Sequence, residues 1–149
     1  MLDIFVEAMG RINFAQYLID RKGITNRVTL NGITLTNWQT YCLPMDEKFI
    51  TSLDLTPDPS PKESGGERPK FFSGNFNLND VADTYLDMRN YKKSVVWVNG
   101  NNLGRYWNKG PQFRLYCPAI FLRKGKNEII VFDLHQQNGA DIKGVKTLE

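Results

Sequence analysis

Residues 95–107, VVWVNGNNLGRYW, carry the pattern that decides the fold. Apolar residues 95–98 alternate between the two faces of an extended strand, and Asn99-Gly100 follows them at once. An Asn-Gly pair between apolar runs predicts a two-residue β-hairpin, because that turn needs a positive φ at both central positions. We expect Trp97 to be a core residue. The stretch therefore predicts an antiparallel sheet.

The rest of the chain repeats this period of two, with apolar positions filled mainly by β-branched and aromatic residues. RVTLNGITL contains a second hairpin signal at Asn31-Gly32, and NEIIVFDL at 127–134 is apolar on both faces, as in a buried strand. Residues 13–20 could form a short helix. Further strands are expected at residues 2–7, 38–43, 71–78, 84–88 and 113–117. Many short strands separated by turns predict an all-β protein, an antiparallel β-sandwich or jelly roll.

Length and charge narrow the class of protein. The chain has 149 residues, too few for an eight-fold barrel, which needs roughly 250. It is 41% apolar and carries a net charge of only +3, with its basic residues scattered beside turns. A nucleic-acid surface would need a continuous basic face, and a membrane span an apolar run of about 20 residues. We expect a globular domain with neither kind of partner.

Cysteine and histidine content argues against a metal site or a histidine-based catalytic site. Cys42 and Cys117 lie far apart in apolar segments, without the close spacing of a zinc or redox motif. We expect buried free thiols, and a disulfide stays open if the parent protein is exported. His135 is the only histidine and follows a strand, where a solvated or capping role fits best. No cofactor and no metal are expected.

Residues 54–69, DLTPDPSPKESGGERP, interrupt the strand pattern with four prolines and two adjacent glycines. Such a segment cannot pair as a strand and has almost nothing apolar to bury, so we expect a weakly ordered surface insertion. The alternative is a ligand for a proline-recognising domain, but the required P-x-x-P spacing beside an arginine is missing.

Several motifs resemble the C-terminal β-domains of the glycoside hydrolase family 35 β-galactosidases. They are LTNWQTYCLPMD (35–46), FFSGNFNL (71–78), VWVNGNNLGRYW (96–107), GPQ (110–112) and KGKNEIIVF (124–132). LDIFVEAMG near the start and NEIIVFDLHQ near the end share an apolar run between two acidic residues, so residues 1–27 are expected to close a preceding β-module and the sandwich to occupy residues 28–149, with the Pro-rich insertion inside it. The resemblance implies that this sandwich is a jelly roll of the galactose-binding-like fold. It also implies a parent enzyme with a catalytic barrel that this chain lacks, and this parent is expected to be exported.

The candidate site lies around the predicted hairpin. Gly104 in the returning strand suggests a β-bulge or a close backbone approach, and the following Arg105, Tyr106 and Trp107 are expected near the rim of the sheet. Aromatic rings stack on the C–H face of a sugar, and Arg and Asn side chains bond hydroxyls. Arg and aromatic residues are also favoured at the centres of protein interfaces. The candidate ligand or interface residues are Asn99, Asn101, Arg105, Tyr106 and Trp107.

Two functions remain open on this evidence. The first is a non-catalytic accessory domain that supports the catalytic barrel of a β-galactosidase and helps shape its substrate site. The second is an independent module that binds galactosides weakly. An enzyme in its own right is discounted, because retaining glycosidases need two carboxyl groups about 5 to 5.5 Å apart. Asp83 and Asp87 are the nearest acidic pair to the motif, and in a strand they stand roughly 13 Å apart.

Overall fold

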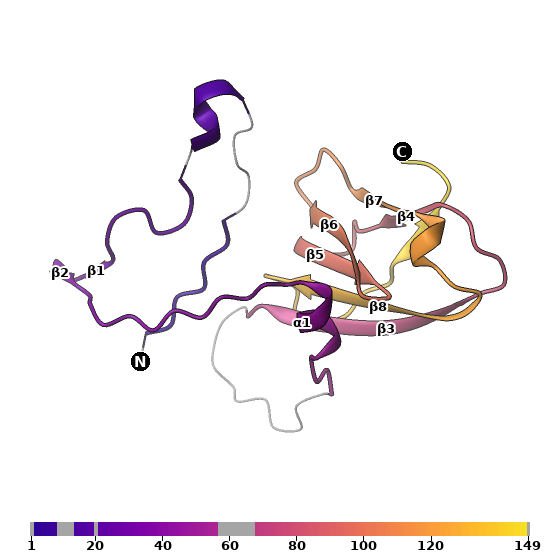
Figure 1. The fold of residues 1–149 in the computed structure, drawn as a ribbon, viewed down its shortest axis with the longest axis horizontal. Helices are drawn as coiled ribbons and strands as arrows, with labels where there is room; N and C mark the ends of the chain where they lie inside the picture. The colour runs from indigo at the N-terminus through magenta and orange to yellow at the C-terminus, as the bar shows by residue number, and fades with distance from the viewer. Residues whose placement is uncertain (1, 9–13, 20, 57–67, 149) are drawn as a thin grey trace. The chain divides into compact units, whose positions relative to one another are not determined.

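A computed structural model describes residues 2–8, 14–19, 21–56 and 68–148, which form two compact units, Met1–Leu43 and Pro44–Glu149. Figure 1 shows the ribbon of both units. The expected Pro-rich insertion lies largely outside the described residues. The division between the units differs from the boundary near Val28 that the sequence suggested, because the Asn31-Gly32 hairpin belongs to the first unit.

The first unit contains little regular structure. A 3-10 helix spans Ala15–Ile19, and the two-residue strands β1 (Thr29–Leu30) and β2 (Ile33–Thr34) form the expected hairpin. The strands expected at residues 2–7 and 38–43 are wrong: no ladder forms there among the described residues. A strand forms only when it pairs with a second strand in a ladder, and neither segment belongs to a ladder within the described part of the unit.

The second unit is an antiparallel sandwich, which confirms the all-β prediction. The larger sheet has the order β3-β8-β5-β6 and the smaller sheet the order β7-β4-β9. The large sheet consists of β3 (Lys70–Leu78), β5 (Lys93–Val98), β6 (Asn101–Trp107) and β8 (Gly125–Asp133). The small sheet consists of β4 (Thr84–Asp87), β7 (Arg114–Cys117) and β9 (Lys143–Val145). The helix α1 (Glu47–Thr51) precedes the sheets, and the 3-10 helix η2 (Ala119–Phe121) follows β7.

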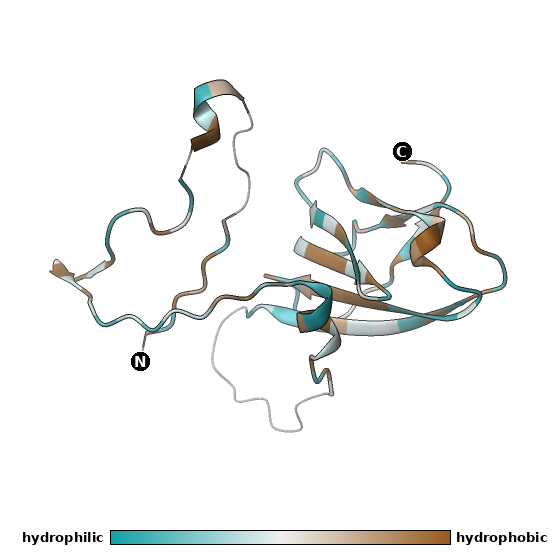
Figure 2. Cartoon of the chain, viewed as in Figure 1, coloured by the Kyte–Doolittle hydropathy of each residue, from teal (hydrophilic) through white to brown (hydrophobic). Residues whose placement is uncertain are grey.

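The central strands of the large sheet are apolar on both sides, and residues of both sides are buried in a core. Figure 2 shows hydrophobic residues along β5 and β8. The core between the sheets contains Leu86, Val96, Val98, Tyr106, Leu115 and Val131. On the opposite face Trp97, which is 0% exposed, packs with Ile130, Phe132 and Ile50 of α1. Trp97 is therefore a core residue, as expected, but of the layer beneath the helix.

The β5–β6 connection has the predicted geometry. Asn99 and Gly100 have φ values of 49° and 82°, the positive angles that the two-residue turn requires. Val96 pairs with Gly104 but Trp97 pairs with Asn102, so Leu103 is the extra residue of a bulge. Gly104 has a φ of 104°, and its N–H donates to the side chain of Asn102 at 2.7 Å. The bulge predicted at Gly104 is confirmed.

The two cysteines have different surroundings. Cys117 is buried between the sheets, as expected, and burial raises the pKa of its thiol to about 11. Cys42 is exposed, contrary to expectation, because its segment forms no strand that would turn the side chain toward a core. Both thiols are free.

Candidate functional site

The five candidate residues of the hairpin divide into inward and outward groups. Tyr106 is 2% exposed, so it does not lie at an open rim as expected. Its hydroxyl donates to the carbonyl oxygen of Phe132 at 2.8 Å and to Oδ2 of Asp133 at 2.9 Å. Burial and then the Asp133 charge raise the pKa of Tyr106. Tyr106 faces the core because the bulge changes which residues of β6 point inward.

The two asparagines of the turn are used inside the fold. Asn99 donates to the carbonyl oxygen of Phe121 at 2.7 Å and to Oδ1 of Asn127 at 2.8 Å, and it accepts from the Glu128 N–H at 3.0 Å. Asn101 donates to two backbone carbonyls of the same turn, both at 3.2 Å. The Asn99 amide holds the hairpin against β8 and the loop before it, and the Asn101 amide closes the turn, which leaves both poorly placed to bind a ligand.

Arg105 and Trp107 point outward, on the face opposite Tyr106. In the β5–β6 ladder Arg105 pairs with Val95, and Trp107 pairs with Lys93. The Lys93 ammonium lies over the indole of Trp107, 5.1 Å from its ring centroid, and Trp107 is still 44% exposed. We call Lys93, Arg105 and Trp107 the β6 strip. It combines the cations of Lys93 on β5 and Arg105 on β6 with the indole of Trp107 on β6, the last strand of the large sheet.

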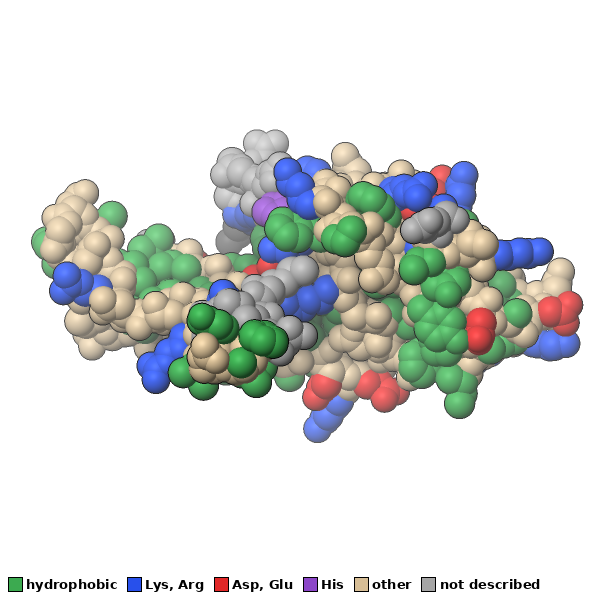
Figure 3. Space-filling view, turned by 90° about the horizontal axis from the view of Figure 1, so that it is seen from above, with side chains coloured by type: hydrophobic (Ala, Val, Ile, Leu, Met, Phe, Trp, Pro, Cys, Tyr) green, Lys and Arg blue, Asp and Glu red, His purple; other side chains and the backbone are tan. Residues whose placement is uncertain are grey.

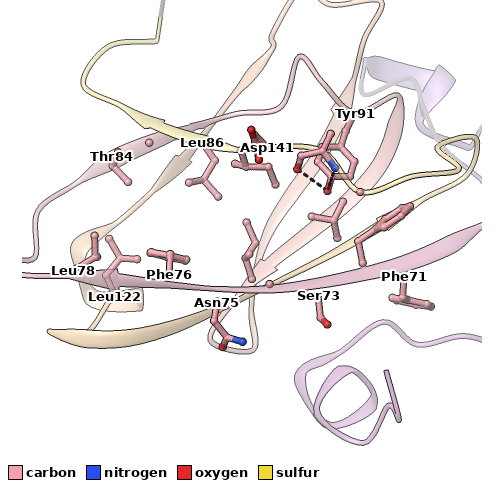
Figure 4. A pocket seen from close by; sticks show the side chains of 18 of the residues that line it. Phe71, Ser73, Asn75, Phe76, Leu78, Thr84, Leu86, Tyr91, Leu122 and Asp141 are labelled. Atoms are coloured by element: carbon pink, nitrogen blue, oxygen red, sulfur yellow. Dashed lines mark hydrogen bonds between the residues drawn. The ribbon is translucent and has the colours of Figure 1, made fainter. Parts of the chain in front are cut away.

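A groove of about 1450 Å³ opens between the sheets, beside β3 and the segment that leads into β9. In Figure 4 the side chains of Phe76, Leu86 and Leu122 point into it, whereas Ser73 and Asn75 point away. This lining continues the apolar core toward the surface. Polar residues, among them Lys70, Asp80, Thr84 and Asp141, also line the groove, so its lining is mixed.

The outer face of the small sheet carries two neighbouring tyrosines that are not among the five candidate residues. Tyr116 of β7, Tyr85 of β4 and Val145 of β9 are neighbours across the three strands. We call these three residues the aromatic face. Tyr116 is 47% exposed, and its ring lies 5.5 Å from that of Tyr85. The alternation in FRLYC, with Leu115 and Cys117 inward, was a usable signal for an outward Tyr116.

The acidic pair considered in the sequence has separate structural contacts. Asp83 accepts from the Tyr116 hydroxyl at 2.6 Å and from the Ala119 N–H at 2.8 Å. Asp87 pairs with Arg114 at 3.4 Å and with Arg89 at 3.8 Å. Each carboxylate is therefore held by its own partners rather than facing the other across a cleft.

No group of His, Cys, Asp and Glu side chains in the described part of the chain is arranged to hold a metal ion. Nor does any described helix have the length and apolar character to cross a membrane.

Two family models match the sequence of the chain. A family model described as "Beta-galactosidase, galactose-binding domain" matches residues 69–127, and one described as "Beta-galactosidase, first all-beta domain" matches residues 1–44. The chain belongs to the β-galactosidase family. The resemblance read from the sequence is thus confirmed. The second match ends beside the boundary between the two units.

The chain is also similar in sequence to individual members of the β-galactosidase family. The chain is 37% identical over 147 residues to Beta-galactosidase 17 of Arabidopsis thaliana, with 89% of the chain and 21% of that protein aligned. It is 39% identical over 135 residues to human Beta-galactosidase-1-like protein 2, with the same two shares aligned. Beta-galactosidase 1 of Dictyostelium discoideum is 37% identical, with 89% of the chain and 20% of that protein aligned.

The chain spans about a fifth of the length of these relatives. Both matched models describe accessory β-domains of β-galactosidases, so the chain by itself is a non-catalytic part of this family.

Proposed function

We propose that this chain is the accessory β-region of a β-galactosidase, and that its sandwich supports the catalytic domain of the same polypeptide. The β6 strip is the surface through which it docks. The observation that carries this proposal is the outward pair Arg105 and Trp107 on the last strand of the large sheet. Aromatic and arginine side chains dominate the binding energy of protein interfaces.

The strip suits a protein partner better than a sugar. Lys93 covers part of the Trp107 ring, and the neighbouring Asn99 and Tyr106 are already bonded inside the fold. Little therefore remains to bind hydroxyl groups. A protein interface can use the flat indole and the guanidinium together, since neither requires the turn amides.

The test compares the whole protein with the isolated chain. Arg105→Ala and Trp107→Ala should lower the thermal stability of the full-length protein, each by about 2 kcal/mol, because interface centres lose this much on truncation. The isolated chain should change by less than about 0.5 kcal/mol, as expected for exposed positions. Arg123→Ala, at another exposed arginine, is the matched control. Equal losses in both contexts would show that the residues act within the sandwich and would overturn the docking proposal.

Galactoside binding by the sandwich is the second candidate function. The description of the model matched over residues 69–127 favours it. The β6 strip is a poor site for a sugar, so this function requires another surface.

A further inference from the structure

Tyr116 is a fixed, outward-facing ring. It alternates in β7 with buried Leu115 and Cys117, so the strand itself directs the phenol to the outer face. Its hydroxyl is held by Asp83 at 2.6 Å, and one side of the ring rests against Tyr85 with an interplanar angle of 52°. A ring held at its tip and its side loses little conformational entropy when a ligand stacks on it.

Asp83 places a charged acceptor at the edge of that ring. One carboxylate oxygen accepts from Tyr116 and the other from the Ala119 N–H, so the group has a defined orientation. A carboxylate offers about four acceptor positions, which leaves capacity for ligand hydroxyl groups. The hydrogen bonds from Tyr116 and Ala119 also lower the pKa of Asp83, so it stays ionised in mildly acidic solution.

Residues around Tyr116 and Asp83 add further apolar and charged side chains to this surface. Ile120 in η2 follows the Ala119 that bonds Asp83, and it is 86% exposed. Figure 3 shows hydrophobic side chains gathered on one face of the molecule, with acidic side chains beside them. Arg114 and Asp87 form a charged row beside the aromatic face. An exposed ring, an oriented carboxylate and a charged border are the elements that bind a sugar ring.

We propose that the aromatic face binds one pyranose ring of a β-galactoside, which stacks on Tyr116 and donates hydroxyl hydrogen bonds to Asp83. The apolar C–H face of the sugar covers the exposed phenol, and Ile120 borders it. This inference rests on the galactoside-binding candidate above and assigns it a place. An open, single-ring site of this kind binds in the millimolar range.

The experiment titrates methyl β-D-galactopyranoside into the isolated 149-residue chain and follows its amide resonances. Shifts should gather at residues 83–87 and 114–120. Tyr116→Ala should weaken binding about tenfold or more, because the stacking surface is lost, whereas Tyr116→Phe should retain most of it. Asp83→Asn should weaken binding with the ring still present, which keeps the test valid if Tyr116→Ala perturbs the fold. Tyr41→Ala, at an exposed tyrosine of the first unit, is the matched control and should leave the dissociation constant unchanged.

Four results would contradict the proposed sugar site, and each contradicts a different part of it. Sorbitol has hydroxyl groups but no ring face, so equal shifts with sorbitol would overturn the stacking site. Shifts at the β5–β6 hairpin that vanish in Trp107→Ala would show that the galactoside binds at the hairpin. This result would overturn the assignment of the site to the aromatic face. Absence of any shift would overturn both the site and the galactoside-binding candidate, while the docking proposal keeps its own stability test. A full-length protein destabilised by Tyr116→Ala, with no sugar response, would assign the face to protein contact and overturn the inference.

Discussion

Asp133 joins the ends of neighbouring strands through one buried carboxylate. Its Oδ2 accepts from the backbone N–H groups of Lys92 and Lys93 at 2.8 and 3.1 Å and from the hydroxyl of Tyr106 at 2.9 Å. Its Oδ1 accepts from the N–H groups of His135 and Gln136, both at 2.9 Å. A fully buried charge is tolerated only with such complete bonding. The network connects the start of β5 and the side chain of Tyr106 to the end of β8.

Tyr106→Phe tests this network. The substitution keeps the ring but removes a donor from two buried acceptors, Asp133 and the Phe132 carbonyl. We expect unfolding to become easier by about 1–3 kcal/mol, the cost of buried groups left without their hydrogen bond. Urea denaturation of the isolated chain measures it. Tyr85→Phe is the control, since the described residues include no hydrogen bond to that hydroxyl, and a comparable loss there would contradict the argument.

The two thiols should react at different rates. Cys117 is buried and its pKa is raised to about 11, so at pH 8 it is protonated and shielded, whereas Cys42 is exposed. The thiolate is the reactive form. Iodoacetamide should therefore modify Cys42 in the native chain and reach Cys117 only on unfolding or well above pH 8. Peptide mass spectrometry distinguishes the sites, and early labelling of Cys117 would show that the sandwich core opens readily.

The β5–β6 hairpin is the element in which local sequence and final geometry agree most closely. Asn99 and Gly100 adopt the positive φ values that their residue types favour. The bulge at Leu103 and Gly104 then shifts the alternation, so Tyr106 faces the core while Arg105 and Trp107 face outward. Local pattern alone predicted a bulge but not which side chains it would bury.

Gly104→Ala tests the bulge. A Cβ there would meet no atom within 4 Å, so any cost comes from the φ of 104° rather than from a clash. An alanine at such an angle should destabilise the chain by about 1 kcal/mol or more. Gly139→Ala is the matched control, because Gly139 lacks a positive φ and its Cβ would make an ordinary 3.7 Å contact with Phe72. Thermal melts of both variants measure the difference, and equal melting temperatures would rule out strain at Gly104.

At the scale of the molecule, the core belongs to the second unit. Both apolar clusters lie within Pro44–Glu149, between the sheets and beneath α1. The described residues of Met1–Leu43 include no buried side chain. Without burial, a segment cannot offset the conformational entropy lost on folding.

A fragment of residues 44–149 should therefore fold alone, whereas residues 1–43 should not. The larger fragment should melt cooperatively with the circular dichroism of a β protein, and its amide spectrum should match that of the same residues in the whole chain. The smaller fragment should give an unfolded spectrum. Loss of cooperative melting in residues 44–149 would show that the sandwich requires the first unit.

The candidate surfaces could be predicted only in part. Arg105 and Trp107 are exposed, as the sequence suggested. Tyr106 is not, because the bulge and the Asp133 network draw it inward. The alternation in FRLYC predicts that Tyr116 points outward, but the stretch contains no turn or motif that would mark Tyr116 as a binding residue. Its proximity to Asp83 arises where β4 pairs with β7, across residues far apart in the chain.

The sequence by itself determined the all-β class, the two Asn-Gly turns, the bulge and the β-galactosidase family, because these depend on side-chain alternation, local φ preferences and motifs along the chain. Only the tertiary structure decided that Trp97 lies under α1, that Asp133 binds the ends of neighbouring strands, and that Asp83 meets Tyr116. The physical reason is that these contacts join residues distant in sequence. Their formation depends on how strands pair and how layers cover one another, which period and composition do not specify.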